Sequence, residues 1–356
     1  MRTRSRWWTT GNRTTRLSSR PGLPFPSSVP DYSEDFIRNA KEIFARAEAL
    51  AGDDATRRRV LKARLPVEYY EFLRDSAFEV RNGTYGPVDA GSLMMRGKDL
   101  FSRMRTFGIE SIHEGQTLDR DEKRLSETKS LPAIALENAA WRVDVVPDLN
   151  ARVVRMIDKA TGRDAGGLLA TAHSNYYARA WDVRWTPDFE INATRLALIG
   201  RCDNGVRLQG TLELTPSGLH TVTVAENSGS SPVAVALQVR AEWAPGDIDG
   251  AAMMFMRASG ERVERKFIVE GEPPTGKETW TGRERPAGQW QLLRVPGEAL
   301  FTRFVDAQVE RSYLNWTAKS RPGVTFGIWS PVRMLSPGQS VRLEADYGIR
   351  QGEPRL

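Results

Sequence analysis

The stretch that decides the fold is residues 136–167, LENAAWRVDVVPDLNARVVRMIDKATGRDAGG. Apolar Trp141, Val143 and Val145 alternate with polar residues, which is the pattern of a half-buried β-strand. Turn-forming Pro, Asp and Asn follow, then a second extended run over 151–157, and the sequence DKATG turns the chain again. The stretch therefore predicts two consecutive strands joined by a tight turn.

The same period of two continues towards the C-terminus. Gly, Asn, Asp, Ser and Pro supply the turns between the extended runs, as in Asp203-Asn204-Gly205. Many strands at short spacing, without helices between them, predict an antiparallel sandwich or barrel. The expected strands are 139–146, 151–157, 194–200, 205–214, 219–226, 233–241, 262–269, 290–294, 323–329 and 340–347.

Upstream of this region, apolar residues recur at helical spacing instead. The segment DYSEDFIRNAKEIFARAEALAGDD has one apolar stripe, with Ser33 as a candidate N-cap and Gly52 as a stop. A second helix follows over ATRRRVLKARLPVEYYEFLRDSAFEV, and we expect Pro66 to kink or interrupt it. A third helical stretch covers about Ser92 to Phe107.

These patterns predict an α+β chain, in which a small N-terminal α-helical region precedes a large antiparallel β-sandwich. The expected divisions are a disordered basic tail over 1–30, the α-helical region over 31–110, a polar linker over 111–131 and the β-sandwich domain over 132–351.

The net charge of +6 is carried by the first of these segments. Residues 1–30 hold six arginines and no acid, so the 45 basic side chains that remain balance the 45 acidic ones. A neutral folded body argues against nucleic acid as a partner. The tail lacks the apolar centre of a secretory signal, although its composition partly resembles that of a transit peptide.

Hydropathy and cysteine content exclude further classes of protein. No apolar run approaches the roughly 20 residues that span a bilayer, so no membrane partner is expected. The single cysteine, Cys202, excludes an internal disulfide framework and a cysteine-rich zinc site.

Three stretches carry a resemblance to a known family. Residues 136–167 resemble the opening of galactose-mutarotase-like supersandwich domains. The segment VRLQGTLELTPSGLHTVTVAENSGSSPVAVALQVRAEWAPGD resembles their central strands, and SPVRMLSPGQSVRLEADYGI resembles their last strand pair. The resemblance covers roughly residues 132–351 and implies a supersandwich fold with a role in carbohydrate chemistry.

The helical part, DFIRNAKEIFARAEALAGDDATRRRVLKARLPVEYYEFL, resembles the helical region that follows the catalytic barrel of alpha-glucuronidase-like proteins. That likeness implies the C-terminal part of a glycoside hydrolase-like protein, with a catalytic barrel upstream and a periplasmic or secreted location. A (β/α)₈ barrel needs roughly 250 residues, and the chain shows no alternating strand and helix pattern that would supply one.

The resemblance also allows the family's chemistry to be tested. A mutarotase needs a general acid and a general base, which are a His and a Glu in that family. Arg240 stands nearest to the family's His, and the stretch FGIWSPVR has no acid where the family has its Glu. Because arginine stays protonated, we assign no catalytic residue. No cofactor or metal is expected either, since no two histidines have metal-ligand spacing, and His220 alternates with valines as a sheet-face or core residue does.

The segment HSNYYARAWDVRW is the candidate binding site. Its aromatic rings offer flat faces to the C–H faces of sugars, and its charged side chains suit hydroxyl groups. The tryptophans can equally belong to the core of a large sandwich, and the arginines can pair with acids. The candidate carbohydrate-binding residues are His173, Tyr176, Tyr177, Arg179, Trp181, Asp182, Arg184 and Trp185.

Two functions fit these observations. One is a non-catalytic carbohydrate-associated module whose sandwich binds an oligo- or polysaccharide. The alternative is a carbohydrate-active hydrolase, epimerase or lyase with an unfamiliar acid and base set, such as His173 with Asp182 or Glu190. A purely structural interaction domain is a third option. Geometry separates them, because catalytic groups must converge in one place.

Overall fold

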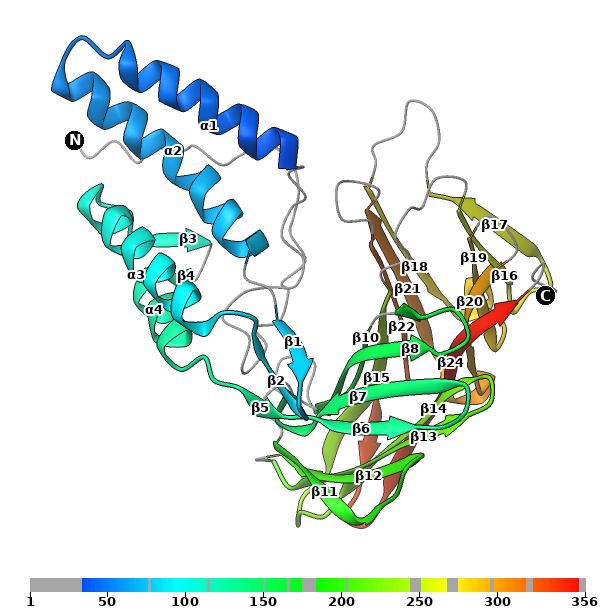
Figure 1. The fold of residues 1–356 in the computed structure, drawn as a ribbon. Coiled ribbons are helices and arrows are strands. Elements are labelled where there is room, and N and C mark those ends of the chain that lie inside the picture. The colour runs from blue at the N-terminus through cyan, green and yellow to red at the C-terminus, as the bar shows by residue number, and fades with distance from the viewer. Residues whose placement is uncertain are drawn as a thin grey trace.

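The computed structural model describes residues 34–75, 78–113, 116–149, 151–164, 167–174, 184–202, 204–243, 251–267, 275–294, 298–317 and 323–351. These residues form a helical region and a β-sandwich beside it (Figure 1). The α+β class and the order of the two parts agree with the sequence prediction.

The helical region is built from a few short elements in chain order. They are α1 (Glu34–Ala49), α2 (Asp54–Asp75), β1 (Phe78–Arg81), β2 (Thr84–Pro87), α3 (Ala90–Thr106), β3 (Ser111–His113), β4 (Gln116–Thr117), α4 (Leu118–Ser126) and β5 (Leu131–Pro132). None of the described helices is both long and apolar enough to cross a bilayer.

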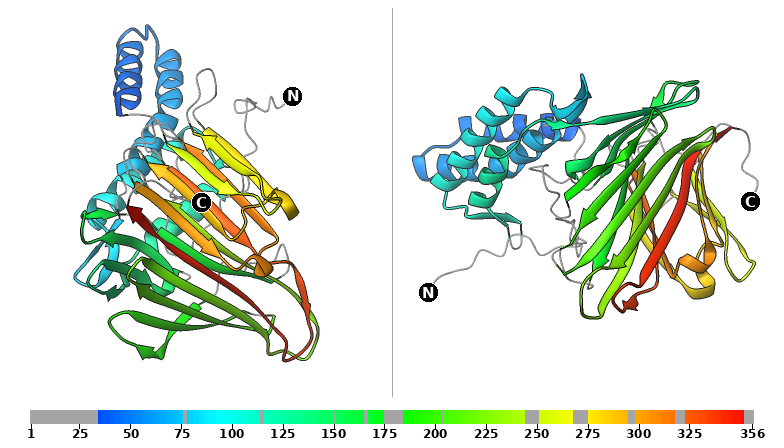
Figure 2. Two further views of the ribbon diagram at one scale, coloured as in Figure 1. Left: turned by 90° about the vertical axis from the view of Figure 1, so that its right-hand side faces the viewer. Right: turned by 90° about the horizontal axis from the view of Figure 1, so that it is seen from below.

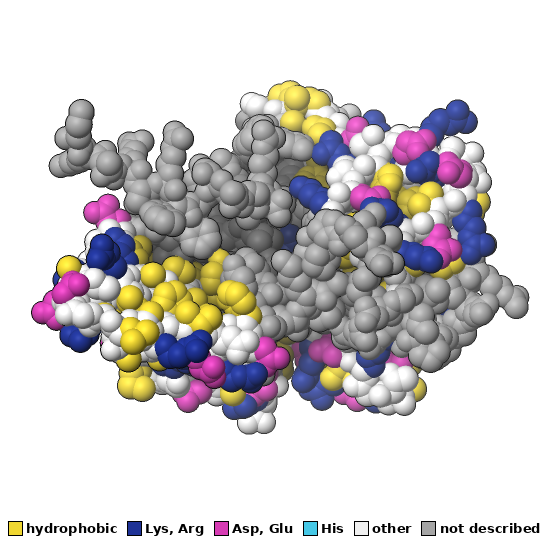
Figure 3. All heavy atoms as spheres, turned by 90° about the horizontal axis from the view of Figure 1, so that it is seen from above, with side chains coloured by type: hydrophobic (Ala, Val, Ile, Leu, Met, Phe, Trp, Pro, Cys, Tyr) yellow, Lys and Arg dark blue, Asp and Glu magenta, His cyan; other side chains and the backbone are white. Residues whose placement is uncertain are grey.

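One hydrophobic core holds α2, α3 and α4 together. Its buried members are Leu65, Tyr69, Phe72, Leu73, Leu93, Leu100, Phe101, Met104, Leu118 and Leu125. Of the kink or interruption that we expected at Pro66, the structure does not show the interruption, since α2 continues through the proline, with Leu65 and Tyr69 buried on either side of it. Hydrophobic side chains also gather on the surface of this region (Figure 3). Its exposed large hydrophobic residues include Phe36, Ile43 and Met95.

The segment predicted to be a linker, 111–131, holds helix α4. The hydroxyl of Thr117 accepts a hydrogen bond from the backbone N–H of Arg120 and caps its N-terminus. Leu118 and Leu125 are one heptad apart and both fully buried, so two apolar residues suffice to dock an otherwise charged helix.

The sandwich consists of two antiparallel sheets packed face to face (Figure 2). The first is a ten-stranded sheet in the order β18 (Thr275–Thr281), β21 (Arg311–Thr317), β22 (Gly323–Trp329), β15 (Val233–Trp243), β10 (Gly167–Ser174), β8 (Arg152–Asp158), β7 (Trp141–Val146) and β6 (Ile134–Glu137), with β23 (Arg333–Leu335) beside β15 and β9 (Arg163–Asp164) beside β8.

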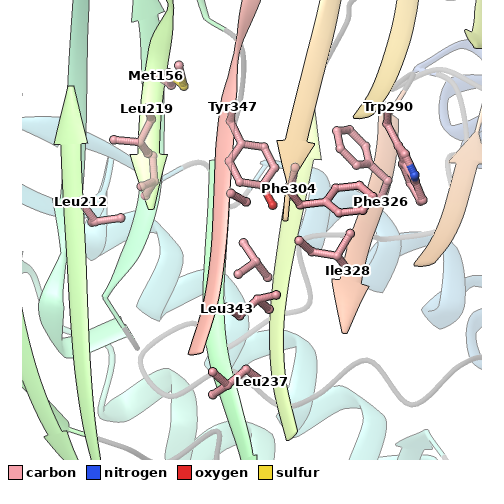
Figure 4. Close-up of a cluster of buried hydrophobic side chains, with 14 of the residues drawn as sticks. Met156, Leu212, Leu219, Leu237, Trp290, Phe304, Phe326, Ile328, Leu343 and Tyr347 are labelled. Atoms are coloured by element: carbon pink, nitrogen blue, oxygen red, sulfur yellow. The ribbon is translucent and has the colours of Figure 1, made fainter. Parts of the chain in front are cut away.

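The second is a nine-stranded sheet. Its order is β11 (Arg184–Ile191), β12 (Arg195–Arg201), β13 (Val206–Thr215), β14 (Gly218–Asn227), β24 (Ser340–Gln351), β20 (Glu298–Phe304), β19 (Gln289–Arg294), β16 (Ala252–Met256) and β17 (Arg262–Lys266). Leu237, Phe326 and Ile328 of the first sheet meet Leu219 and Tyr347 of the second in the core (Figure 4).

The opening stretch folds as predicted. Strands β7 and β8 pair antiparallel across a 3-10 turn at Pro147–Leu149. Leu131, Val146 and Leu149 form a small separate hydrophobic cluster there, which joins β5 of the helical region to the side of the ten-stranded sheet that faces away from the core.

Candidate functional site

The described members of HSNYYARAWDVRW do not lie on one sheet. His173 is on β10, where its backbone pairs with that of Ala236 on β15. Arg184 and Trp185 are on β11 of the other sheet. Tyr176, Tyr177, Arg179, Trp181 and Asp182 lie outside the described residues. Glu190, which the enzyme hypothesis paired with His173, is also on β11.

A different set of polar residues converges on the ten-stranded sheet. Val235, Leu237, Val239 and Ala241 of β15 point into the core, so Gln238, Arg240 and Glu242 alternate with them and belong to the opposite side. We call this opposite side the outer face. All the residues described next lie on it.

The centre of the outer face is a carboxylate shared by two arginines, Arg152–Glu242–Arg240, which we call the arginine pair. Arg152 of β8 donates from Nη2 to one oxygen of Glu242, and Arg240 donates from Nη2 to the other. All three side chains are largely buried, with exposed fractions of 9% for Arg152, 12% for Arg240 and 17% for Glu242. Such charge-assisted bonds fix the direction of both guanidinium planes.

Tyr313 of β21 joins this group from the other side. Its hydroxyl accepts a hydrogen bond of 3.3 Å from Nε2 of Gln238 and also interacts with Arg240. The strand between them, β22, places Gly327 opposite both Arg240 and Tyr313. Because Gly327 has no side chain, the ring of Tyr313 can lie across β22 and reach β15.

A half-buried aromatic ring continues the same surface. Trp329 of β22 pairs with Gln238 on one side and with Arg311 on the other. The guanidinium of Arg311 lies over the indole ring of Trp329, with 6.0 Å from its carbon to the ring centroid. The outer face thus combines two aromatic rings with planar hydrogen-bonding groups.

A second charged group, Arg142–Asp144–Arg155, lies on β7 and β8 beside the arginine pair. Asp144 is 1% exposed, and its Oδ2 accepts from Nε of Arg155 at 2.6 Å. Its Oδ1 lies 3.5 Å from Nε of Arg142. A register shift between β7 and β8 at this point keeps both Arg152 and Arg155 on the outer face, although they are three residues apart.

The electrostatics of the site favour permanent charge over proton transfer. Burial by itself lowers the pKa of Arg240, but the negative charge of Glu242 and the contact with Tyr313 outweigh it, so the pKa lies above its ordinary value. Arg240 therefore keeps its positive charge beside Glu242 and is not suited to exchange protons. Within the described part of the chain, no group of histidine, cysteine and acid residues has the arrangement of a metal site.

The remaining described histidine side chain is not part of this face. His220 of β14 is 25% exposed, and its Nδ1 lies 2.7 Å from Oδ1 of Asp346 on β24. Of the two positions that the sequence left open, sheet face or core, His220 takes the sheet face, and it belongs to the nine-stranded sheet.

Sequence reasoning found Arg240 but not its partners. It reached Arg240 only as the residue nearest to the family's His and gave it no role in a site. A signal that could have found this face is the interruption of the apolar run VAVALQVRAEW by Gln238, Arg240 and Glu242 at alternate positions. The partners on β8 and β21 carry no signal of their own, because only the strand order brings Arg152 and Tyr313 next to β15.

Comparison with known proteins supports the fold. No protein-family model matches the sequence, and no curated protein does. Among solved structures, a galactose mutarotase-like protein from Lactobacillus casei ATCC 334 is similar over 61% of this chain and 100% of its own, with a TM-score of 0.50 and 12% identity.

Two further solved structures are similar with lower TM-scores. An aldose epimerase homologue from C. elegans is similar over 62% of this chain and 99% of its own, with a TM-score of 0.48 and 9% identity. A putative aldose 1-epimerase from Escherichia coli K12 covers the same shares, with a TM-score of 0.46 and 11% identity. The similarity to the Lactobacillus structure shows that the sandwich has the galactose-mutarotase-like fold.

Proposed function

We propose that the outer face of the ten-stranded sheet is a carbohydrate-binding surface and that the chain acts as a non-catalytic carbohydrate-associated module. The observation that carries this proposal is the juxtaposition of Tyr313 and Trp329 with the arginine pair. Sugars bind where aromatic rings meet their C–H faces and planar polar groups bond to their hydroxyls. The fold similarity is consistent with a role in carbohydrate chemistry, since the matched structure is a galactose mutarotase-like protein.

The non-catalytic half of the proposal rests on the chemistry of the same residues. Arg240, which stands nearest to the family's catalytic His, cannot act as a general acid, because it keeps its proton. Glu242 is bonded to two guanidinium groups at once, which holds it as a charged acceptor rather than a free base.

A glycan microarray probed with the purified chain tests binding, with Trp329→Ala as the informative variant. We expect wild-type binding to at least one oligosaccharide and a loss of about tenfold in affinity for Trp329→Ala, because the stacking surface is removed. Arg207→Ala is the matched control, since Arg207 lies on the nine-stranded sheet. A wild-type chain that binds no glycan, or a Trp329→Ala variant that binds as the wild type does, contradicts the proposal.

The alternative function is a carbohydrate epimerase. The observation that favours it is the position of His173, whose backbone pairs with Ala236 on the same strand that carries Gln238 and Arg240. Polarimetry of galactose mutarotation decides between the two functions. Acceleration by the wild-type chain that disappears in His173→Ala supports the enzyme; the binding module predicts no acceleration in either.

A further inference from the structure

We propose that the outer face selects acidic carbohydrates, with the arginine pair binding the carboxylate of a uronic acid residue. This inference rests on the proposed carbohydrate-binding function and names the chemical class of the ligand. It follows from the charge of the face and from the hydrogen-bonding capacity that its arginines retain.

The charge of the outer face is positive at both of its polar groups. Two guanidinium groups share the single carboxylate of Glu242, and two more share that of Asp144. Each group therefore has one positive charge in excess. The excess is local, since residues outside the 1–30 segment carry equal numbers of basic and acidic side chains.

Two hydrogen-bond donors of the arginine pair have no acceptor in the described part of the chain. Nη1 of Arg152 and Nε of Arg240 are shielded from water, and neither has a hydrogen-bond partner among the described residues. The Arg152 side chain is more than nine-tenths buried. A buried donor without a partner is costly, so an anionic oxygen that reached these nitrogens would recover that cost. Guanidinium groups match carboxylates in particular, because two parallel N–H donors fit the two oxygens.

The aromatic rings beside the arginines favour an anion that is part of a sugar over a free inorganic anion. Tyr313 touches the arginine pair through Arg240. Trp329 lies two residues beyond Gly327 on β22, at the next position of that strand on the outer face. A free inorganic anion would use the arginines alone. A uronate places a carboxylate and a C–H ring face within one residue, which is the combination that this surface offers.

The test compares two ligands that differ only at the carboxyl group, which is a charged carboxylate in one and a neutral methyl ester in the other. Oligogalacturonate and its fully methyl-esterified form present the same ring faces and hydroxyls, and calorimetry measures the affinity of the full chain for each. We expect oligogalacturonate to bind at least about tenfold more tightly, and this preference to shrink as salt is added. Arg152→Gln should lose the preference while it keeps the weaker binding of the ester, and Glu242 keeps Arg240 as a partner in that variant.

The outcomes separate this inference from the proposed function. If both ligands bind equally, or if Arg152→Gln keeps the full preference, the acidic selectivity is wrong while the binding surface stands. If neither these ligands nor any microarray glycan binds, the proposed function fails and the selectivity with it. Arg207→Gln, on the nine-stranded sheet, should retain both affinities. A preference that is equally lost in Arg207→Gln would show a general charge effect and would also overturn the inference.

Discussion

The ring of Tyr313 lies against the backbone of Gly327, on the strand next to its own. A β-carbon placed on Gly327 would stand 2.4 Å from Cε1 of Tyr313 and 3.0 Å from its hydroxyl oxygen. Real β-carbons do not approach other atoms so closely. Gly327 thus gives Tyr313 the room to cross β22, which lets its hydroxyl reach Gln238 and Arg240 on β15.

Gly327→Ala should therefore displace Tyr313 from the outer face and also disturb the packing of its ring against β22. We expect a loss of about 1–3 kcal/mol in the free energy of unfolding, because a methyl group is forced into a filled space, together with weaker glycan binding. Chemical denaturation and calorimetry measure the two effects. In a Tyr313→Ala background the same substitution should cost almost nothing, since the clashing ring is absent. Equal costs in both backgrounds would show that the ring is not what the methyl group meets.

Asp144→Ala should destabilise the sandwich more than removal of an exposed acid. Asp144 is 1% exposed and bonded to Arg155, so its loss leaves cations without their partner. We expect the free energy of unfolding to fall by about 3 kcal/mol. This is the low end of the range for a broken buried ion pair, because Arg155 is 30% exposed and water can solvate it in the variant. Glu213→Ala is the control, since Glu213 is 49% exposed and should cost less than about 1 kcal/mol. Similar denaturation midpoints for the two variants would contradict the prediction.

The start of α2 should contribute stability that depends on pH. Asp53 accepts bonds from the backbone N–H of Thr56 at 2.7 Å and from its hydroxyl at 2.8 Å, and these lower the pKa of the carboxyl. A lowered folded-state pKa contributes stability that is present above the unfolded-state value and is lost as the pH falls through the folded-state value.

Melting temperatures of wild type and Asp53→Asn, measured from neutral to acidic pH, test this. The amide still accepts a hydrogen bond but does not titrate, so the wild-type advantage should shrink as the pH falls below the ordinary Asp pKa of about 3.9. If the difference in melting temperature between the two proteins stays constant across that pH range, ionisation of the Asp53 carboxyl is not its cause.

Alternation along single strands was enough to predict the sandwich. Strands β12, β13, β14 and β24 keep one apolar face over many residues, and the sequence placed each of them to within a few residues. The sequence missed several other strands, including β10, β20 and β21. Two more that it missed are β16, whose residues AMMFM are mostly buried, and β18, whose TGKETWT is mostly polar. Neither has a period of two in its hydropathy, and only their neighbours make them strands.

The site was less predictable than the fold. Aromatic and charged residues close together in sequence, as in 173–185, suggested a binding surface, but strands separate such residues onto two sheets. The arginine pair joins residues that are 90 positions apart. Nothing local marks Arg152 as the partner of Glu242, because the contact exists only once β10 lies between β8 and β15.

Leu125→Ala should show that α4 is part of the helical region and not a linker. Leu125 is fully buried against Phe72 and α3, where Gly97 leaves room for it: a β-carbon on Gly97 would stand 2.2 Å from Cδ2 of Leu125. Truncation to alanine should cost about 2–5 kcal/mol, because it leaves a cavity at the centre of a small core. Circular dichroism followed during denaturation should show the helical signal lost earlier. Lys123→Ala, at a side chain that is 73% exposed, serves as the control and should leave the transition in place. If 111–131 acted only as a linker, Leu125→Ala would behave like Lys123→Ala.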